Sequence, residues 1–405
     1  MSLTVINGTL IDGTGADPRA ATIVIDGGRF TSVTSAAAAA QREEVIDAAG
    51  LTLLPGLIDL HTHMGILDVV DGSGLSAAMA AALLFENAEL CLQSGHTTAR
   101  EVAGADGALK EVIDAGLVPG PRLFPSGPLI SQSGGHGDHS SPWLGGHHAA
   151  TSLPGLSQTS VVVDGVDEMR KAARLAFKHG ATQLKVCISG GVVSFTDRME
   201  DTQLSIEELR VAVDEARARD TYVTGHAHNV QSIENGLLAG LECFEHGTFL
   251  DEATVVKLAA AGAALVPTLT VAHLMATEWK AWGIPDSLVP RINGVEEAMA
   301  RSLKLAYDAG VLIGSGTDLL GPHQNRRGLE LVLKAGVLGP MAAIVSATSA
   351  SAKVLRRDDL GIVATGKTAD LIAVAGDPLS DPTLFDQPDK IVLVIKDGRV
   401  VKDLR

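Results

Sequence analysis

Aromatic residues are scarce in this chain of 405 residues. Phenylalanine, tyrosine and tryptophan together make up 3% of it, although hydrophobic residues make up 46%. A chain of this length and hydrophobicity can bury a large core. That core must therefore be built mainly from aliphatic side chains and alanine.

Cysteine is also scarce, and the three cysteines, Cys91, Cys187 and Cys243, lie far apart in the sequence. Their odd number and wide spacing exclude a disulfide framework and predict buried thiols in a reducing compartment. The first residues, "MSLTVINGTLIDG", lack the basic start and apolar run of a secretory signal peptide. We therefore expect a cytoplasmic protein.

Positive charge is in deficit, with 32 lysines and arginines against 48 aspartates and glutamates, a formal net charge of -16. Such a surface repels phosphate backbones, so we expect no nucleic acid partner. Long apolar runs are missing as well. The most lipid-like stretch, 258–276, contains Gly262, Pro267 and His273, which indicate a helix end, a turn and a buried strand. We expect no membrane partner either.

Alternating apolar residues are present at both ends of the chain. The segments "LTVINGTLIDG" and "ATIVIDGGRFTSV" near the start, and "DLIAVAG" and "KIVLVIKDGRVV" near the end, have the pattern of half-buried antiparallel strands. We predict that residues 1–55 and 364–405 combine into one small β-sandwich domain.

The middle of the chain repeats a different pattern, in which a short apolar run is followed by a helical stretch. The eight runs span 56–63, 97–102, 122–127, 183–189, 222–228, 243–248, 264–270 and 311–318. Eight such repeats predict the α/β class and a closed (β/α)8 TIM barrel over residues 56–363. An open doubly wound sheet is the alternative, but it normally carries a glycine-rich phosphate fingerprint after its first strand, and none is present.

Polar residues lie within or at the ends of several of these runs. In β/α barrels the catalytic residues lie at the carboxyl ends of the strands. The polar residues of these runs are His61, His63, Lys185, His226, His228, His246 and Asp318. The strand period of two places the members of each histidine pair on one face. One such pair is weak evidence, but imidazoles and a carboxylate converging from several strands predict a site for zinc or a similar divalent ion.

Lys185 needs a separate explanation, because an ammonium group is repelled by metal cations. Burial disfavours its charge, and a deprotonated amine can react with carbon dioxide to form an anionic carbamate. The two carbamate oxygens can bridge two metals. The alternative is a lysine that extends from the barrel rim into solvent.

The motifs around these residues resemble the amidohydrolase superfamily over nearly the whole chain. "PGLIDLHTH" resembles its first-strand signature, and "GKTADLIAVAGDPL" resembles its return into the small β domain. "SQSGGHGDH", "KVCISGGV", "GHAHN", "FEHGTFLD" and "GSGTDLL" resemble the binuclear branch of prolidase-like and Xaa-Arg/Lys dipeptidase-like enzymes. Imidazolonepropionase-related and ochratoxinase-like amide hydrolases are neighbours of that branch.

The resemblance implies a ligand set for two divalent metal ions, of which zinc is the first expectation. His61, His63 and Asp318 would hold the more buried ion, and His226 and His246 the other. Lys185, carboxylated to N6-carboxylysine, would bridge them. His136 and His228 match positions that contact the substrate.

The expected activity is hydrolysis of an amide bond next to a carboxylate, in a dipeptide of Xaa-Pro or Xaa-Arg/Lys type or in an N-acyl amino acid. Two cations lower the pKa of a shared water enough to supply hydroxide, and Asp318 would serve as general base and then acid. His136 and His228 would donate hydrogen bonds to the oxyanion or the carboxylate. The alternatives are a hydrolase of xenobiotic amides, carbamates or ureas, a heterocycle deaminase, and a scaffold without activity.

Two further residues are candidates for binding the small-molecule substrate. Trp143 lies in the glycine-rich loop that contains His136, and Arg198 follows the fourth run. Ordinary packing for Trp143 and a surface ion pair for Arg198 are the alternatives. Barrels of this size often associate, so we also expect a homo-oligomer.

Overall fold

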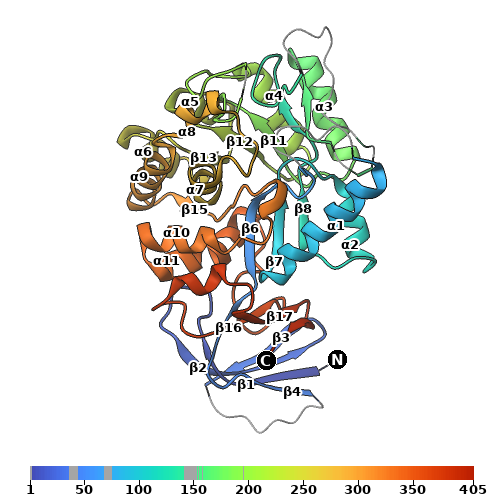
Figure 1. Cartoon of the computed structure of the whole chain (residues 1–405), viewed down its shortest axis with the longest axis vertical. Helices are drawn as coiled ribbons and strands as arrows, with labels where there is room; N and C mark the ends of the chain where they lie inside the picture. The colour runs from blue at the N-terminus through green and yellow to red at the C-terminus, as the bar shows by residue number, and fades with distance from the viewer. Residues whose placement is uncertain are drawn as a thin grey trace.

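The structure is a computed structural model of the whole chain. It describes residues 2–35, 44–67, 75–140, 153, 155–156, 158–194 and 196–405. Figure 1 shows a large barrel with its helices at one end of the molecule and a small sheet domain at the other, where both chain termini lie.

The small domain is built from strands of both chain ends. Its sheet has the order β18-β17-β16-β5-β1-β2-β3, with β4 paired to β1. The strands are β1 (Ser2–Leu10), β2 (Arg19–Asp26), β3 (Arg29–Thr34), β4 (Glu44–Asp47), β5 (Leu51–Pro55), β16 (Leu371–Ala375), β17 (Ile391–Lys396) and β18 (Arg399–Asp403). The antiparallel pair of β5 and β16 joins the two ends of the sequence. Strands β1 to β5, β16 and β17 share one mainly aliphatic core, as the sandwich prediction required.

The barrel is formed by parallel strands in two hydrogen-bonded groups, β6-β7-β8 and β10-β9-β11-β12-β13-β14-β15. They are β6 (Leu57–Thr62), β7 (His96–Glu101), β8 (Arg122–Pro125), β9 (Leu129–Ser131), β10 (Ser160–Val162), β11 (Leu184–Cys187), β12 (Val223–Ala227), β13 (Cys243–His246), β14 (Ala264–Val266) and β15 (Leu312–Ile313). The two groups meet where Leu60 donates to the carbonyl of Ser315 and Thr62 bridges Leu319. The predicted TIM barrel with a small sandwich domain is confirmed.

Helices surround the barrel (Figure 1). They are α1 (Ala77–Gln93), α2 (Gly107–Asp114), α3 (Val166–Lys178), α4 (Ile206–Arg217), α5 (Val230–Ala239), α6 (Glu252–Ala260), α7 (Leu269–Glu278), α8 (Val289–Ile292), α9 (Val295–Asp308), α10 (Leu329–Leu338), α11 (Pro340–Val345) and α12 (Ser351–Val354). Short 3-10 turns cover Asp286–Leu288, Gly321–His323 and Pro382–Asp386, and a π-helical turn covers Ser346–Ala350.

Local sequence explains the helix starts that the periodicity predicted. Ser205 accepts a hydrogen bond from the backbone of Glu208, and the Glu208 side chain accepts one in return, which is the capping box that begins α4. In the part of the chain that the structure describes, no helix combines the length and the apolar character that crossing a bilayer requires. Cys91, Cys187 and Cys243 are buried free thiols, as predicted.

Two of the apolar runs form shorter strands than predicted. The run 264–270 contributes only the three residues of β14, because Pro267 cannot donate to the ladder and α7 begins at Leu269. The run 311–318 contributes only the two residues of β15. Its remainder passes the barrel mouth as irregular chain, and this irregular segment carries Asp318.

Candidate metal centre

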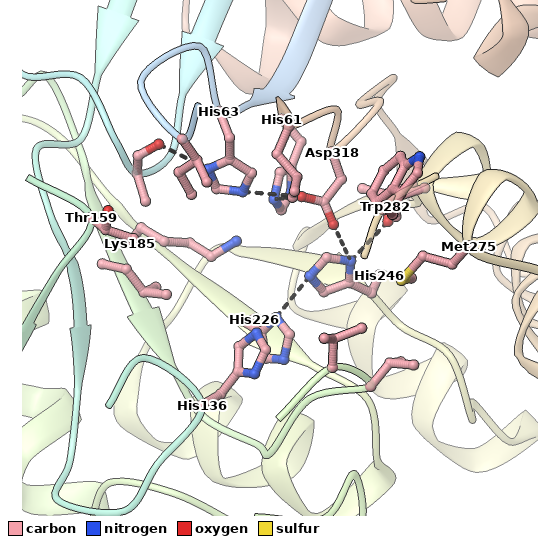
Figure 2. Close-up of a pocket in the computed structure, with 18 of the residues that line it drawn as sticks. His61, His63, His136, Thr159, Lys185, His226, His246, Met275, Trp282 and Asp318 are labelled. Carbon is pink, nitrogen blue, oxygen red and sulfur yellow. Dashed lines mark hydrogen bonds and ion pairs between the residues drawn. The ribbon is translucent and has the colours of Figure 1, made fainter. Parts of the chain in front are cut away.

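A cavity of about 340 Å³ opens at the carboxyl ends of the barrel strands. Figure 2 shows histidines from several strands and Asp318 pointing toward one another inside it. Its lining includes all of the residues for which the sequence predicts metal binding: His61, His63, Lys185, His226, His246 and Asp318. His136 and His228 line it too.

The first group of donors comes from the end of β6 and the segment after β15. Oδ1 of Asp318 lies 3.3 Å from Nε2 of His61 and 3.0 Å from Nε2 of His63. One donor atom from each of the three residues falls within 4.8 Å of the others. This spacing fits a single cation held by two imidazoles and a carboxylate.

The second group comes from the ends of β12 and β13. Nδ1 of His226 lies 2.8 Å from Nε2 of His246, and the ring of His228 completes a second cluster within 4.8 Å. Asp318 connects the two groups, because its Oδ2 lies 3.8 Å from Nδ1 of His246. The structure therefore brings together two neighbouring donor sets that share one carboxylate.

Each histidine that the sequence assigned to a metal is held through its other ring nitrogen. Nδ1 of His61 contacts Glu245 at 2.7 Å, and Nδ1 of His63 contacts the carbonyl of Ala103 at 2.9 Å. Nδ1 of His246 contacts Thr268 at 2.8 Å, and Nε2 of His226 contacts the carbonyl of Gly190 at 3.3 Å. Outer oxygens of this kind fix the tautomer and orientation of metal-binding imidazoles.

Lys185 on β11 lies between the two donor sets. Figure 2 shows its side chain between His63 and His226, with the amine directed toward the space between the clusters. The residue is 2% exposed. Burial lowers the pKa of its amine, although Glu245 and Asp318 oppose this shift. Lys185 thus reaches the centre of the cavity instead of the solvent.

The protonation states of the cluster suit metal binding. Burial and the neighbouring rings hold the pKa values of His226 and His246 well below the usual value for histidine, so these imidazoles are neutral. Burial alone would raise the pKa of Asp318, but His61 and His63 lower it well below its usual range. Burial opposes protonation of His63 as well, but its contact with Asp318 raises its pKa. The imidazoles of the second set and the carboxylate of Asp318 are thus in the forms that coordinate divalent ions.

The backbone at two of the donors is strained. His246 has φ of 65° and Asp318 has φ of 57°, values that favour glycine and that non-glycine residues adopt at a cost. His246 is the last residue of β13, and Asp318 lies in the irregular segment after β15. Both side chains point into the same cavity. Strain of this kind is retained where a side chain must point in one direction, which supports a functional role.

A buried ion pair between Arg100 and Glu245 supports the first group. Position at a strand end made Glu245 one of two glutamates, with Glu101, that could orient a histidine, but nothing in the sequence pointed to Arg100. Arg100 donates to Oε1 of Glu245 at 2.5 Å, while the other carboxylate oxygen of Glu245 faces His61. Arg100 also donates to the carbonyl of Leu60 at 2.6 Å. Arg100 and Glu245 are fully buried, so this pair fixes both the ring of His61 and the strand that carries it.

A second buried ion pair, between Asp59 and Arg327, supports the strand that carries His61. Asp59 accepts from Nη1 of Arg327 at 2.6 Å and from the hydroxyl of Thr317 at 2.7 Å. It also accepts from the backbone of His61 at 3.1 Å. Asp59 therefore ties the first histidine strand to the segment that ends in Asp318.

His136 stacks on His226, with ring centroids 4.3 Å apart. A β-carbon at Gly191 would lie 2.1 Å from its Nδ1, so the ring position depends on a glycine there. Within the described residues, Nδ1 of His136 is buried without a hydrogen-bond partner. Burial and the nearby His139 lower the pKa of His136 to about 3. Its neutral ring is therefore available to a bound ligand.

Of the two other predicted substrate residues, the structure describes only Arg198. Arg198 pairs with Asp201 at 2.7 Å, its side chain is 77% exposed, and it is absent from the described lining. This placement corresponds to the surface ion pair that the sequence left as the alternative. Trp143 lies outside the described residues.

Arg291 is a nearby cation that sequence reasoning missed. It donates to the carbonyl of Ser194 at 2.6 Å and to that of Gly191, and it lies 3.8 Å from Asp197. Its charge contributes to the lowered pKa values of His136 and His228. The surrounding sequence "VPRING" carries no motif that would have identified it.

Residues 52–401 match the profile described as "Amidohydrolase family". The chain belongs to the amidohydrolase family. Ochratoxinase from Aspergillus niger is 31% identical over 363 residues, covering 86% of this chain and 75% of that protein. This amidohydrolase is therefore a hydrolase that acts on C–N bonds of small molecules.

Solved structures similar to this amidohydrolase include a prolidase, a Xaa-Pro dipeptidase and an ochratoxinase. A prolidase complexed with N-methylphosphonate-L-proline is 33% identical with a TM-score of 0.93, and 100% of both chains is covered. A Xaa-Pro dipeptidase with bound methionine is 31% identical with a TM-score of 0.87, covering 99% of this chain and 100% of that one. Aspergillus niger ochratoxinase is 28% identical with a TM-score of 0.86, covering 99% and 96%.

His246 and His228 of this amidohydrolase each contact a threonine. Substituting the two threonines one at a time tests whether the histidines have different roles. Thr268 holds Nδ1 of His246, and Thr248 holds Nδ1 of His228 at 2.7 Å. We expect Thr268→Val to weaken zinc binding by about 10–100-fold, as is usual when an outer partner of a ligand is lost. Thr248→Val should leave zinc affinity within about threefold and act on KM instead, because the sequence predicts that His228 contacts the substrate and not the metal. Competition with a chelator measures both affinities, and equal losses would make His228 a metal ligand.

Proposed function

We propose that this chain is a binuclear amide hydrolase that holds two divalent ions, with zinc as the first expectation. His61, His63 and Asp318 would hold one ion, and His226 and His246 the other. The observation that carries this proposal is the pair of donor sets, which meet at Asp318 through contacts of 3.0–3.8 Å. Lone buried histidines would be costly to retain without such a purpose.

We assign the bridge between the ions to Lys185 as N6-carboxylysine. The lysine is buried among donors for cations, where an ammonium group would be repelled. Burial lowers the pKa of the amine and so favours the free base, which is the form that reacts with carbon dioxide. The resulting carbamate is an anion with two oxygens, which matches the position between the two donor sets.

When bound, the two cations would supply Lewis-acid chemistry, polarising the scissile carbonyl and lowering the pKa of the attacking water. Asp318 would take the proton from that water and pass it to the leaving nitrogen, as general base and then general acid. Its position at the junction of both donor sets supports this role. The neutral rings of His136 and His228 would donate hydrogen bonds to the developing oxyanion or to the substrate carboxylate.

We further propose that the scissile amide lies next to a carboxylate, as in a dipeptide or an N-acyl amino acid. Two relatives that are at least 31% identical are a prolidase and a Xaa-Pro dipeptidase. The charge of Arg291 near His136 and His228 gives that end of the site a positive potential, because Arg291 influences both rings. A carboxylate is the substrate group that benefits from it.

The second candidate is a hydrolase of xenobiotic amides, carbamates or ureas. The specific observation in its favour is the 31% identity to ochratoxinase across 86% of this chain. Both candidates use the same metal centre, so only the substrate distinguishes them.

A substrate panel tests this choice directly. We expect zinc-loaded protein to hydrolyse dipeptides and N-acyl amino acids, and to hydrolyse the matching amino acid amides, which lack the carboxylate, at least about tenfold more slowly because one charged hydrogen bond is lost. Exhaustive chelation should abolish activity, and added zinc should restore it. Turnover of neutral carbamates or ureas with no turnover of any carboxylate-bearing amide would favour the second candidate.

Two broader expectations from the sequence remain predictions. We propose a homo-oligomer, which light scattering coupled to gel filtration would measure, and a cytoplasmic location, which fractionation of the source cells would test.

A further inference from the structure

The cavity has a second wall beyond the metal donors, and this wall is apolar. It is formed by the segment 267–311 between β14 and β15, which contains α7, α8 and α9. Figure 2 shows Met275 and Trp282 on the far side of His246 from Lys185. The lining side chains of this wall are Val271, Ala272, Met275, Trp282, Val295 and Met299, all of them at most 7% exposed.

Helical spacing explains why these side chains face the same space. Val271, Ala272 and Met275 follow one another at positions i, i+1 and i+4 of α7, and Val295 and Met299 are four residues apart on α9. Trp282 lies between the two helices in sequence, and its ring stacks on His323 with centroids 5.5 Å apart.

The wall is also held in place. The backbone N–H and the hydroxyl of Thr270, at the start of α7, donate to Oε2 of Glu330 at 2.8 and 2.9 Å. Glu330 is fully buried on α10. This anchor fixes α7 next to Thr268, which orients His246, so the wall and the metal donors keep one spacing.

The wall offers no ionised side chain to a charged substrate group, and its one unpaired polar atom in the described residues is the donor Nε1 of Trp282, which cannot accept from a cation. Among the described lining residues, Lys185 and Asp318 are the only charged side chains other than histidines, and both belong to the metal centre. Three charged residues of this segment make their contacts outside the wall. Glu296 contacts His273 at 2.9 Å and Glu278 contacts His323 at 3.4 Å, while Arg291 donates to the carbonyls of Ser194 and Gly191 on the side of His136. A lysine or arginine side chain of a substrate would be desolvated here without a carboxylate to pair with.

We infer that this wall selects amides whose side chain next to the scissile bond is bulky, apolar and uncharged, with Met275, Trp282 and Met299 as the residues that determine specificity. The inference rests on the proposed amide hydrolysis and decides against the Xaa-Arg/Lys type of substrate. Methionine side chains adapt to several shapes, so aromatic and branched aliphatic groups should both be accepted.

The experiment uses zinc-loaded full-length protein and two matched series, N-acetyl-Xaa amino acids and Xaa-Gly dipeptides. Xaa is Phe, Leu, Met, Lys, Arg or Asp. In at least one series we expect kcat/KM for Phe, Leu and Met to agree within about tenfold and to exceed that for Lys, Arg and Asp by at least about a hundredfold. Equal turnover of basic and apolar members in both series would overturn the inference while leaving amide hydrolysis intact.

Substitutions in the wall make the test specific. Met299→Glu should raise the Lys-to-Phe ratio of kcat/KM by at least about tenfold, because it supplies a carboxylate inside the wall. Val256→Glu is the matched control, since Val256 is a 62% exposed apolar residue on α6, and the ratio should not change. If Met299→Glu does not fold, Trp282→Ala replaces it, and it should reduce turnover of Phe more than turnover of N-acetyl-glycine. An unchanged ratio in a folded wall variant would contradict the assignment.

Failure of the underlying function gives a different result. If the panel shows no hydrolysis of carboxylate-bearing amides but turnover of carbamates, the proposed function is wrong. The same comparison of apolar with charged substituents in a carbamate series would still decide the inference about the wall.

Discussion

Lys185→Ala is expected to lose one of the two metal ions of the proposed centre and to lower kcat/KM by at least about a thousandfold. The side chain lies between the two donor sets, and Asp318 is the carboxylate residue among the described lining residues of the cavity. Removing the proposed bridge would leave the second ion with imidazoles and a share of the Asp318 carboxylate, and the loss of a catalytic metal costs several kcal/mol of transition-state stabilisation. Elemental analysis of the purified variant, with parallel kinetics, measures both effects.

The control for this experiment is Lys178→Ala, because Lys178 is an exposed lysine at the end of α3. It should retain both metals and full activity. A small carboxylic acid such as propionate should partly restore activity to Lys185→Ala by supplying an anion to the vacated space. Two metals per chain in Lys185→Ala without any added acid would refute the bridging role.

Arg327→Met is expected to destabilise the barrel by about 3–5 kcal/mol, as measured by the free energy of unfolding in urea. The methionine keeps most of the side-chain volume but leaves the carboxylate of Asp59 without its buried cation. Asp59 would retain only its bonds to Thr317 and to the backbone of His61. A buried charge that loses its partner bears the cost of desolvation without compensation.

The neighbouring Arg326 provides a matched control. It pairs with Asp386 at 2.7 Å, but its side chain is 32% exposed. Arg326→Met should therefore cost only about 0–1 kcal/mol, the usual range for surface ion pairs. Both variants are measured as metal-free protein so that metal binding does not mask the difference. Equal losses for the two variants would contradict the importance of the buried pair.

The sequence predicted the barrel and the small domain because both depend on local periodicity. Alternation at the two ends and repeated apolar runs in the middle are each visible within about ten residues. The two strands that came out short, β14 and β15, are the ones where Pro267 and the irregular chain before Asp318 interrupt the ladder. At β14 the apolar pattern continues into the start of helix α7, and at β15 it continues into the irregular segment that carries Asp318. The pattern alone therefore predicted strands that were too long.

The metal donors were predictable for a related reason. A strand period of two and the rule that barrel chemistry lies at strand ends place His61 and His63 together without any tertiary information. Their outer partners could not be placed from the sequence: Glu245 was one of two glutamates that could orient a histidine, and only the fold brings it to His61. The apolar wall was equally hidden, since Met275 on an amphipathic helix has the same pattern whether it packs in a core or faces a cavity.

The composite small domain has a consequence for synthesis of the chain. The strands β1 to β5 emerge from the ribosome first, but β16, the antiparallel partner of β5, comes only after the entire barrel has been translated. Until then the edge of β5 is an unpaired strand, which can recruit other nascent chains. A ribosome that stalls within the barrel should therefore release a product that requires chaperones, even where the barrel itself has begun to fold.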